Sequence, residues 1–167
     1  NANSDFCLVE MASPIPPVYI PFYAGWNRST TPATQGIGIH HPQGEVKKIS
    51  IDNNPLSIGS YGGTTNAHWR VSTWEDGVTL GGSSGSPIFN QNKQIVGQLH
   101  GGASSCSNQS GITNNTNDYY GRFDISWNTG ATPNTRLKEW LDPSNTGLES
   151  INGINNTSQL PVINGAL

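Results

Sequence analysis

Short stretches in which apolar and polar residues largely alternate recur along this chain, and glycine, proline or asparagine separates them. Residues 36–42 and 45–51 form one pair of such stretches, with a Gln-Gly turn signal between them. Residues 87–90 and 94–100 form a second pair around a short polar turn. Because successive side chains of a strand point to opposite faces, a period of two indicates half-buried strands. We therefore predict two β-hairpins.

Other stretches have less regular patterns. Residues 6–11 (FCLVEM) are mostly apolar and predict a largely buried strand, and residues 118–123 (DYYGRF) predict another. The proline-rich stretch 14–21 is unsuited to a central strand, because proline has no N–H to donate to the ladder. We expect it to run over the surface as a connection. Residues 108–117 are polar and without periodicity, which predicts a loop.

One helical pattern stands near the C-terminal end. Leu137, Trp140 and Leu141 lie at positions i, i+3 and i+4, a spacing that puts them on one helix face. Thr135 is available as the N-cap, and Pro143 as the residue that stops the helix. We predict one short C-terminal helix in an otherwise all-β chain.

Composition and charge narrow the class of protein. The chain has 167 residues, 33% of them hydrophobic, with 20 glycines and 11 prolines. This suits a single all-β extracellular domain with many turns. The formal net charge is -3 and only 11% of residues are charged, so we expect no nucleic acid as partner. No apolar run approaches the roughly 20 residues of a membrane span, so we expect no membrane either.

The loop at residues 81–87 (GGSSGSP) carries the clearest chemical signal. Its glycines permit positive φ angles and leave the backbone bare, so that amide N–H groups can converge on one point. Ser84 stands where a nucleophile would stand, and the amides of Gly82 and Ser84 would form the oxyanion hole of an acyl-transfer enzyme. A Gly/Ser-rich run is also compatible with a plain flexible turn.

Further stretches favour the enzymatic interpretation. They are SDFCLVE at 4–10, AGW at 24–26, IHHP at 39–42, KKIS at 47–50, the Ser84 loop, VGQLHGG at 96–102, DYYGR at 118–122 and WLDP at 140–143. On these residues the chain resembles the bacterial lysyl endopeptidases, a branch of the chymotrypsin-fold serine proteases. The matching stretches occur in family order from about residue 4 to about residue 153.

The resemblance implies an all-β fold: a chymotrypsin-like (trypsin-like) antiparallel β-barrel, of which this chain holds mainly the second barrel and the short C-terminal helix. Residues 1–21 would end the first barrel and cross to the second. Residues 22–151 would form the second barrel, with nucleophile and specificity pocket, and residues 152–167 a linker or tail. We expect no cofactor, and no metal, since no paired cysteine or histidine motif occurs.

The resemblance also assigns roles to single residues. Asp5 would be the triad carboxylate that orients a histidine. Asp118 would be the pocket acid that binds a substrate lysine, whereas Val78 occupies the position where trypsin has its acid. The same pocket would be lined by His100, Gly101 and Tyr61. From the residues alone, Asp118 is also compatible with an acid that ends the loop and caps a turn after Asn117.

In the family the triad runs in the order His, Asp, Ser, but all four histidines of this chain follow Asp5. They are His40, His41, His68 and His100. We therefore expect the base in an N-terminal half of the same protease, which would be a partner of this chain. Because loss of a triad member removes orders of magnitude of rate, the chain alone is expected to be inactive. Without that half, apolar surface around residues 5–11 would be exposed.

The expected function is a secreted serine endopeptidase that cleaves polypeptides after a basic residue, with lysine preferred over arginine. Lysine is preferred because a compact ammonium suits a shallow acidic pocket better than a planar guanidinium. A second interpretation is an inactive protease-like binding or adhesion module, which would have no base histidine anywhere. A third is a bare structural β domain, which predicts no accessible serine.

Two cysteines leave the pairing open. Cys7 falls in the strand predicted to be buried, which favours a free buried thiol. A bridge between Cys7 and Cys106 is the alternative. The resemblance places Cys106 like a family disulfide cysteine whose mate lies upstream.

Overall fold

The computed structural model describes residues 4–106, 109–110, 113–114 and 116–155. The strands are β1 (Phe22–Tyr23), β2 (Gly25–Asn27), β3 (Gly36–His40), β4 (Lys48–Asp52), β5 (Ser57–Tyr61), β6 (Thr64–Val71), β7 (Pro87–Phe89), β8 (Gln94–Gly102), β9 (Gln109–Ser110), β10 (Thr113–Asn114), β11 (Asp118–Arg122), β12 (Ser150–Ile151) and β13 (Ile154–Asn155). Two short helices, α1 (Phe123–Asn128) and α2 (Lys138–Leu141), follow β11. Within the described ranges, neither helix is long and apolar enough to span a membrane.

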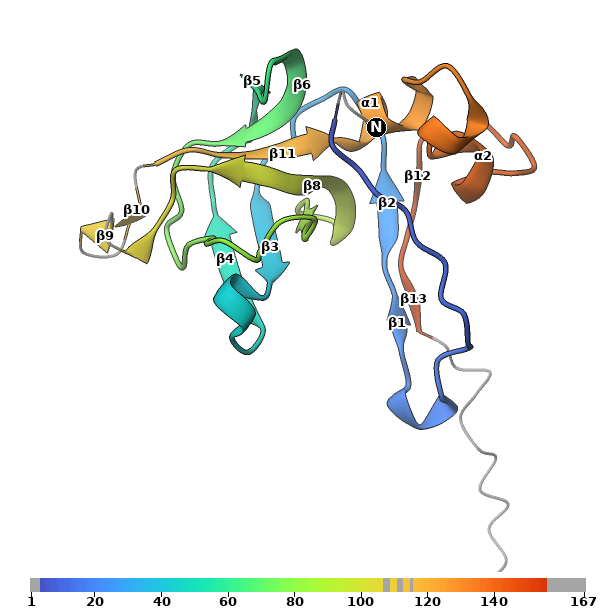
Figure 1. The fold of residues 1–167 in the computed structure, drawn as a ribbon, viewed down its shortest axis with the longest axis horizontal. Helices are drawn as coiled ribbons and strands as arrows, with labels where there is room; N and C mark the ends of the chain where they lie inside the picture. Colours follow the sequence, from blue (N-terminus) through green and yellow to red (C-terminus); the bar gives the residue numbers. More distant parts are fainter. Residues whose placement is uncertain (1–3, 107–108, 111–112, 115, 156–167) are drawn as a thin grey trace, which may run out of the picture.

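Nine strands form one sheet in the described part of the chain. Seven of them follow in the order β4, β3, β7, β8, β11, β6, β5, with every neighbouring pair antiparallel. β2 lies parallel to β8, and β12 pairs with β2. Figure 1 shows both helices gathered where β11 ends, next to β2 and β12.

The expected antiparallel β architecture is confirmed, together with a short helix near the C-terminal end. The resemblance also predicts that the strands close into a barrel. Strand pairing among the described residues forms an open path with β4 and β5 at its two ends, so these pairings close no barrel. Residues 150–155 return to the sheet and to β1 through β12 and β13.

Both predicted hairpins are present. β3 and β4 pair from Gly36↔Asp52 to His40↔Lys48, and the turn between them contains Gln43 and Gly44 at φ angles of 53° and 75°. β7 and β8 form the second hairpin. Its turn is closed by Asn90, whose amide donates to the Gln94 carbonyl at 2.9 Å. The predicted strand at 118–123 is β11, and it ends at Arg122.

Two apolar clusters fill the interior. The larger one lies between the curved strands and consists of Ala33, Leu56, Trp69, Val71, Trp74, Ile88, Val96, Leu99 and Tyr120. The smaller one joins β2 to the helices through Trp26, Phe123, Trp127 and Leu137. Trp26 stacks on Phe123 with ring centroids 5.7 Å apart. Burial of these aromatic rings fixes the start of α1, because Phe123 and Trp127 lie one helical turn apart.

The C-terminal helix is shorter than predicted. Thr135 ends a 3-10 turn that begins after Thr132, and Leu137 is the residue that caps α2. Leu137 is buried as expected, but the Trp140 side chain is 57% exposed. Its indole Nε1 donates to the Pro133 carbonyl at 3.1 Å, which holds the ring along the surface.

The prediction of a buried strand at residues 6–11 is wrong. These residues form no strand, and Leu8, Val9 and Met11 are 46%, 78% and 61% exposed. A strand needs a neighbour to take up its N–H and C=O groups, and none of the described strands pairs with this segment. Cys7 is exposed as well, so its expected burial is also wrong. Both Cys7 and Cys106 are free thiols in the structure.

Candidate active site

The loop with Ser84 is built from two consecutive tight turns. The amide of Ser83 donates to the Leu80 carbonyl at 3.0 Å, and that of Ser86 to the Ser83 carbonyl at 3.1 Å. Gly82 and Gly85 have φ angles of +94° and +80°, where a side chain would be strained. As a result Ser83 is buried inside the loop, while Ser84 stands exposed at its tip.

The amides around Ser84 divide into paired and unpaired groups. The Gly85 amide donates to the Leu99 carbonyl at 2.8 Å, and the Leu99 amide donates to the Ser86 carbonyl at 2.8 Å, which fastens the loop to β8. In the described part of the chain, no acceptor takes up the amides of Gly82 and Ser84. Two unpaired N–H groups beside an exposed hydroxyl are what stabilisation of an oxyanion requires.

Asp5 and Ser84 line the same cavity, of about 610 Å³. The remaining wall is largely apolar and includes Leu8, Trp26 and Phe123. Asp5 itself has a φ of 54°, and its carboxylate Oδ2 lies 3.5 Å from His100 Nε2. The structure therefore brings the two predicted triad members to one apolar cavity.

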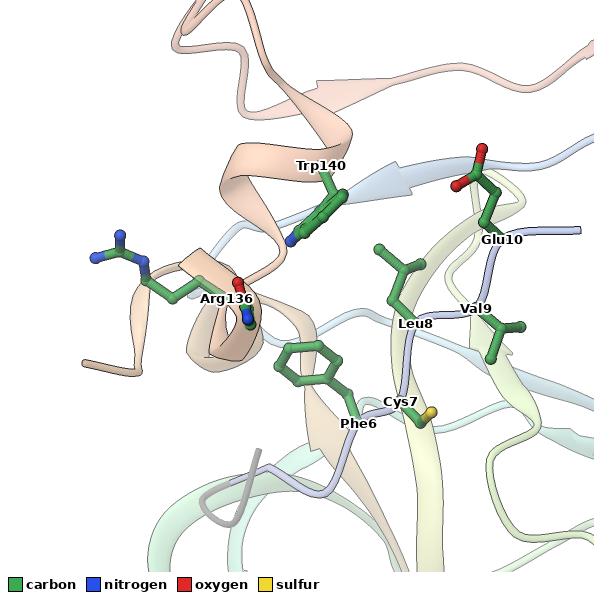
Figure 2. Close-up of a pocket in the computed structure, with 8 residues that line it drawn as sticks. Phe6, Cys7, Leu8, Val9, Glu10, Arg136 and Trp140 are labelled. Atoms are coloured by element: carbon green, nitrogen blue, oxygen red, sulfur yellow. The ribbon is translucent and has the colours of Figure 1, made fainter. Parts of the chain in front are cut away.

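A second, more open cavity of about 850 Å³ adjoins the same segment. Figure 2 shows Phe6, Leu8 and Trp140 turned toward one another, with Val9 on the opposite side of the segment. Asn134 and Arg136 also line this cavity. Apolar side chains of residues 6–10 are thus accessible on both sides of the segment.

None of the four histidines is hydrogen-bonded to Ser84 among the described contacts. His40 contacts Ser83 and Ser50, and exposed His41 contacts the Glu45 carbonyl at 3.1 Å. His68 and His100 are joined to each other, Nε2 to Nδ1, at 2.9 Å.

The three expected pocket residues His100, Gly101 and Tyr61 do lie together. The Tyr61 ring meets His100 edge-on with centroids 5.0 Å apart and stacks on Tyr119 at 4.7 Å. Gly101 lies close to the same ring, since a Cβ there would lie 2.8 Å from the Tyr61 hydroxyl. Sequence reasoning missed His68, which is fully buried behind His100. Burial, with His100 adding a smaller effect, lowers the pKa of His68 to about 4.

Asp118 is only 1% exposed and lies beneath the start of the Ser84 loop. Its Oδ2 accepts hydrogen bonds from Trp74 Nε1 at 2.7 Å, Thr79 Oγ1 at 2.8 Å and Ser104 Oγ at 2.6 Å. No described Lys, Arg or His forms an ion pair with it. Such donors stabilise an anion in a buried place without neutralising it. Val78, the other predicted pocket residue, is half-buried next to Thr79.

Sequence reasoning missed the donors around Asp118 as well. Nothing in the local pattern marks Trp74, Thr79 or Ser104, because they converge only through strand pairing. Among the described residues, no group of three or more His, Cys, Asp or Glu side chains is arranged to hold a metal ion.

Comparison with known proteins identifies the family of this chain. A family model described as "Lysyl endopeptidase, C-terminal domain" matches residues 1–121. A lysyl endopeptidase of Pseudomonas aeruginosa is 38% identical over 130 residues, which cover 74% of this chain and 26% of that relative. The chain thus spans about a quarter of the length of this curated relative. The resemblance to lysyl endopeptidases is confirmed, and the chain belongs to the family of lysyl endopeptidase C-terminal domains.

Proposed function

We propose that this chain is the part of a serine endopeptidase that carries the nucleophile and the substrate pocket. The observation that carries the proposal is the exposed Ser84 hydroxyl between two unpaired amides, in a cavity shared with Asp5. An acyl-transfer enzyme needs these parts: a nucleophile, an oxyanion hole and a carboxylate to orient the base. Their arrangement favours this interpretation over a plain turn.

In this mechanism Ser84 Oγ attacks the carbonyl carbon of the scissile peptide bond. The carbonyl oxygen becomes an oxyanion and accepts hydrogen bonds from the amides of Gly82 and Ser84. A histidine takes the serine proton and then delivers it to the leaving amine, which frees the new N-terminus. Water then attacks the acyl-enzyme by the same route, which releases the new C-terminus and restores Ser84.

We place the base histidine in the rest of the whole protein. None of the four described histidines is hydrogen-bonded to Ser84, and His100, whose Nε2 lies 3.5 Å from Asp5 Oδ2, is paired with His68 through its other ring nitrogen. The cavity between Asp5 and Ser84 is open and apolar, so an imidazole carried by another part of the protein has room to enter. Asp5 would then hold the ring in the productive tautomer.

We infer that Asp118 selects a basic residue, lysine above arginine. The carboxylate is buried with three donors on Oδ2 and no cationic partner, so a substrate ammonium would complete its charge balance. Gly102 keeps side-chain atoms away from Oδ1, because a Cβ on this residue would collide with that oxygen, which accepts only the Ser104 amide, at 3.4 Å, among the described contacts. A broad guanidinium needs more room beside the same atom than an ammonium does.

The test uses the whole protein that carries this chain, with a fluorophosphonate probe and matched lysine and arginine esters. We expect the label on Ser84 and faster turnover of the lysine ester. Asp118→Asn should reduce lysine-ester kcat/KM by on the order of 10²-fold or more and leave labelling of Ser84 largely intact, since the pocket and the nucleophile are separate. Label on a residue other than Ser84 would contradict the proposal. So would an equal loss of kcat/KM for a neutral ester in Asp118→Asn.

A second candidate is an inactive protease-like binding module. It is favoured by one observation: no described histidine is bonded to Ser84. The same experiment separates the two, because a folded whole protein that takes up no label on Ser84 supports the binding module.

A further inference from the structure

The corner between β3 and β4 lies directly against the Ser84 loop. The Gln43 amide donates to the Gly81 carbonyl at 2.7 Å. Approach is so close at Gly82 that a Cβ there would lie 3.0 Å from the Gln43 nitrogen and 3.3 Å from the His41 carbonyl oxygen. The loop is thus held from this side by the corner, and from the other side by β8.

His40, at the end of β3, makes the deepest contact of this corner. Its side chain is 2% exposed, and it bridges two buried serines: Nδ1 lies 2.9 Å from Ser83 Oγ, and Nε2 lies 3.0 Å from Ser50 Oγ. The proposed mechanism gives no role to this buried ring. Its partner Ser83 stands between the two residues whose amides are unpaired.

The hydrogen bonds indicate how the protons are arranged. Ser83 Oγ also receives the Leu80 amide at 3.3 Å, so its own hydrogen is available to donate to His40 Nδ1. His40 Nε2–H then donates to Ser50 Oγ. With a neutral ring, both ring nitrogens are hydrogen-bonded, one as acceptor and one as donor. Burial lowers the pKa of His40, against the opposing charge of Asp118 and with a smaller contribution from His41, which agrees with a neutral ring.

We infer that His40 is the positioning residue of the oxyanion hole: through its bond to the Ser83 side chain, it fixes the orientation of the Gly82 and Ser84 amides. The carbonyl of Ser83 and the amide of Ser84 belong to one peptide group, so anchoring Ser83 restrains the rotation of that group. The inference rests on the proposed function, because it assigns those amides to an oxyanion.

Two substitutions separate the two halves of the bridge. In His40→Asn, a terminal side-chain atom lies as many bonds from Cα as Nδ1 does and can accept from Ser83. In His40→Gln, the terminal atoms lie further out, at the depth of Nε2, and can reach Ser50 instead. Both remove an aromatic ring from the same buried place, so their effects on folding should be alike.

In the whole protein, we expect His40→Gln and Ser83→Ala to slow fluorophosphonate labelling of Ser84 and lower kcat by roughly 10²-fold, the usual cost of losing an oxyanion donor, with little change in KM. His40→Asn should recover most of the rate. Asp52→Ala is the matched control: it removes a buried acceptor at the opposite end of the same hairpin, which binds Asn54. It should lower the melting temperature without slowing the labelling of folded protein.

Amide NMR shifts of Gly82 and Ser84 give a readout that needs no activity. We expect both to move in His40→Gln and Ser83→Ala and to stay near wild type in His40→Asn. Equal labelling and equal shifts in the two His40 variants would overturn the inference. If the wild type takes no label while the shifts behave as expected, the proposed function fails and the anchoring role of His40 stands. If the wild type is labelled on Ser84 and the variants are labelled equally fast, the proposed function stands and the role of His40 fails.

Discussion

His68 and Asp52 are buried titratable side chains with displaced pKa values. The pKa of His68 is lowered and that of Asp52 is raised, so their effects on stability change with pH in opposite directions. His68 is 0% exposed and Asp52 1% exposed, and burial is the largest cause in both. Burial disfavours the charged form, so it lowers the pKa of the imidazole and raises that of the carboxyl. Each group therefore makes the free energy of unfolding depend on pH.

For His68, the pKa falls from 6.5 to about 4 in the folded protein. Between these values the unfolded chain binds a proton that the folded protein refuses, so stability is lost as pH falls from 6.5 to about 4. The loss amounts to about 3 kcal/mol at most. We expect the ring of His68, followed by NMR, to stay neutral until pH nears 4. Titration near 6.5 would contradict this.

For Asp52, the pKa rises from 3.8 to about 6, although two hydrogen bonds from Asn54 favour the ionised form. Here the folded protein holds a proton that the unfolded chain releases, so stability is gained as pH falls from about 6 to 3.8 and lost as pH rises through 6. Urea unfolding of Asp52→Asn should therefore show a steeper loss of stability on acidification than the wild type. His68→Gln should show a shallower one, and parallel curves for all three proteins would refute both assignments.

At the scale of elements, the contact between β8 and β11 depends on glycine. A Cβ on Gly97 would lie 2.6 Å from the Gly121 carbonyl oxygen, and this obstacle is backbone that cannot rotate away. We expect Gly97→Ala to lower the free energy of unfolding by roughly 1–3 kcal/mol, the usual cost of overpacking. Gly81→Ala is the control, because nothing lies within 4 Å of a Cβ there. Equal unfolding midpoints for the two variants would show that the strands can move apart.

The elements also show how far local pattern reaches. A period of two and turn residues predicted the β3–β4 and β7–β8 hairpins, since each needs only neighbours in sequence. The same reasoning failed at residues 6–11, where none of the described strands pairs with the apolar run. It also missed α1, because the strand predicted at 118–123 includes Phe123, the first residue of that helix. Packing of Phe123 and Trp127 on Trp26 is what favours a helix there.

At the scale of the whole molecule, apolar side chains are exposed along one connected course from Leu8 to Tyr23. Besides residues 8–11 it includes Val18, Tyr19, Ile20 and Phe22, which are 80%, 72%, 56% and 56% exposed. Figure 1 shows this course running down past β12 and β13 and turning back into β1, away from the curved strands. Contiguous apolar surface of this kind is typical of interaction sites.

We expect the chain of residues 1–167 on its own to bind an apolar dye and to self-associate, because water contacts this surface. Val9→Ser with Met11→Ser should weaken both effects, as measured by dye fluorescence and sedimentation. Val46→Ser is the control, since Val46 is 69% exposed on the β3–β4 corner, outside this course. A wild-type monomer that binds no dye would contradict the expectation.

The sequence by itself determined what depends on near neighbours: the hairpins, the position of Ser84 in a loop of permissive glycines, and the family resemblance. Tertiary structure alone decided which distant groups meet. Trp74 and Asp118 are 44 residues apart and His40 and Ser83 are 43 apart, yet both pairs are hydrogen-bonded. Such contacts follow from strand order and register, and a shift by one residue would turn each side chain to the opposite face. The surroundings of Asp118 and Ser84 therefore had to be read from the fold.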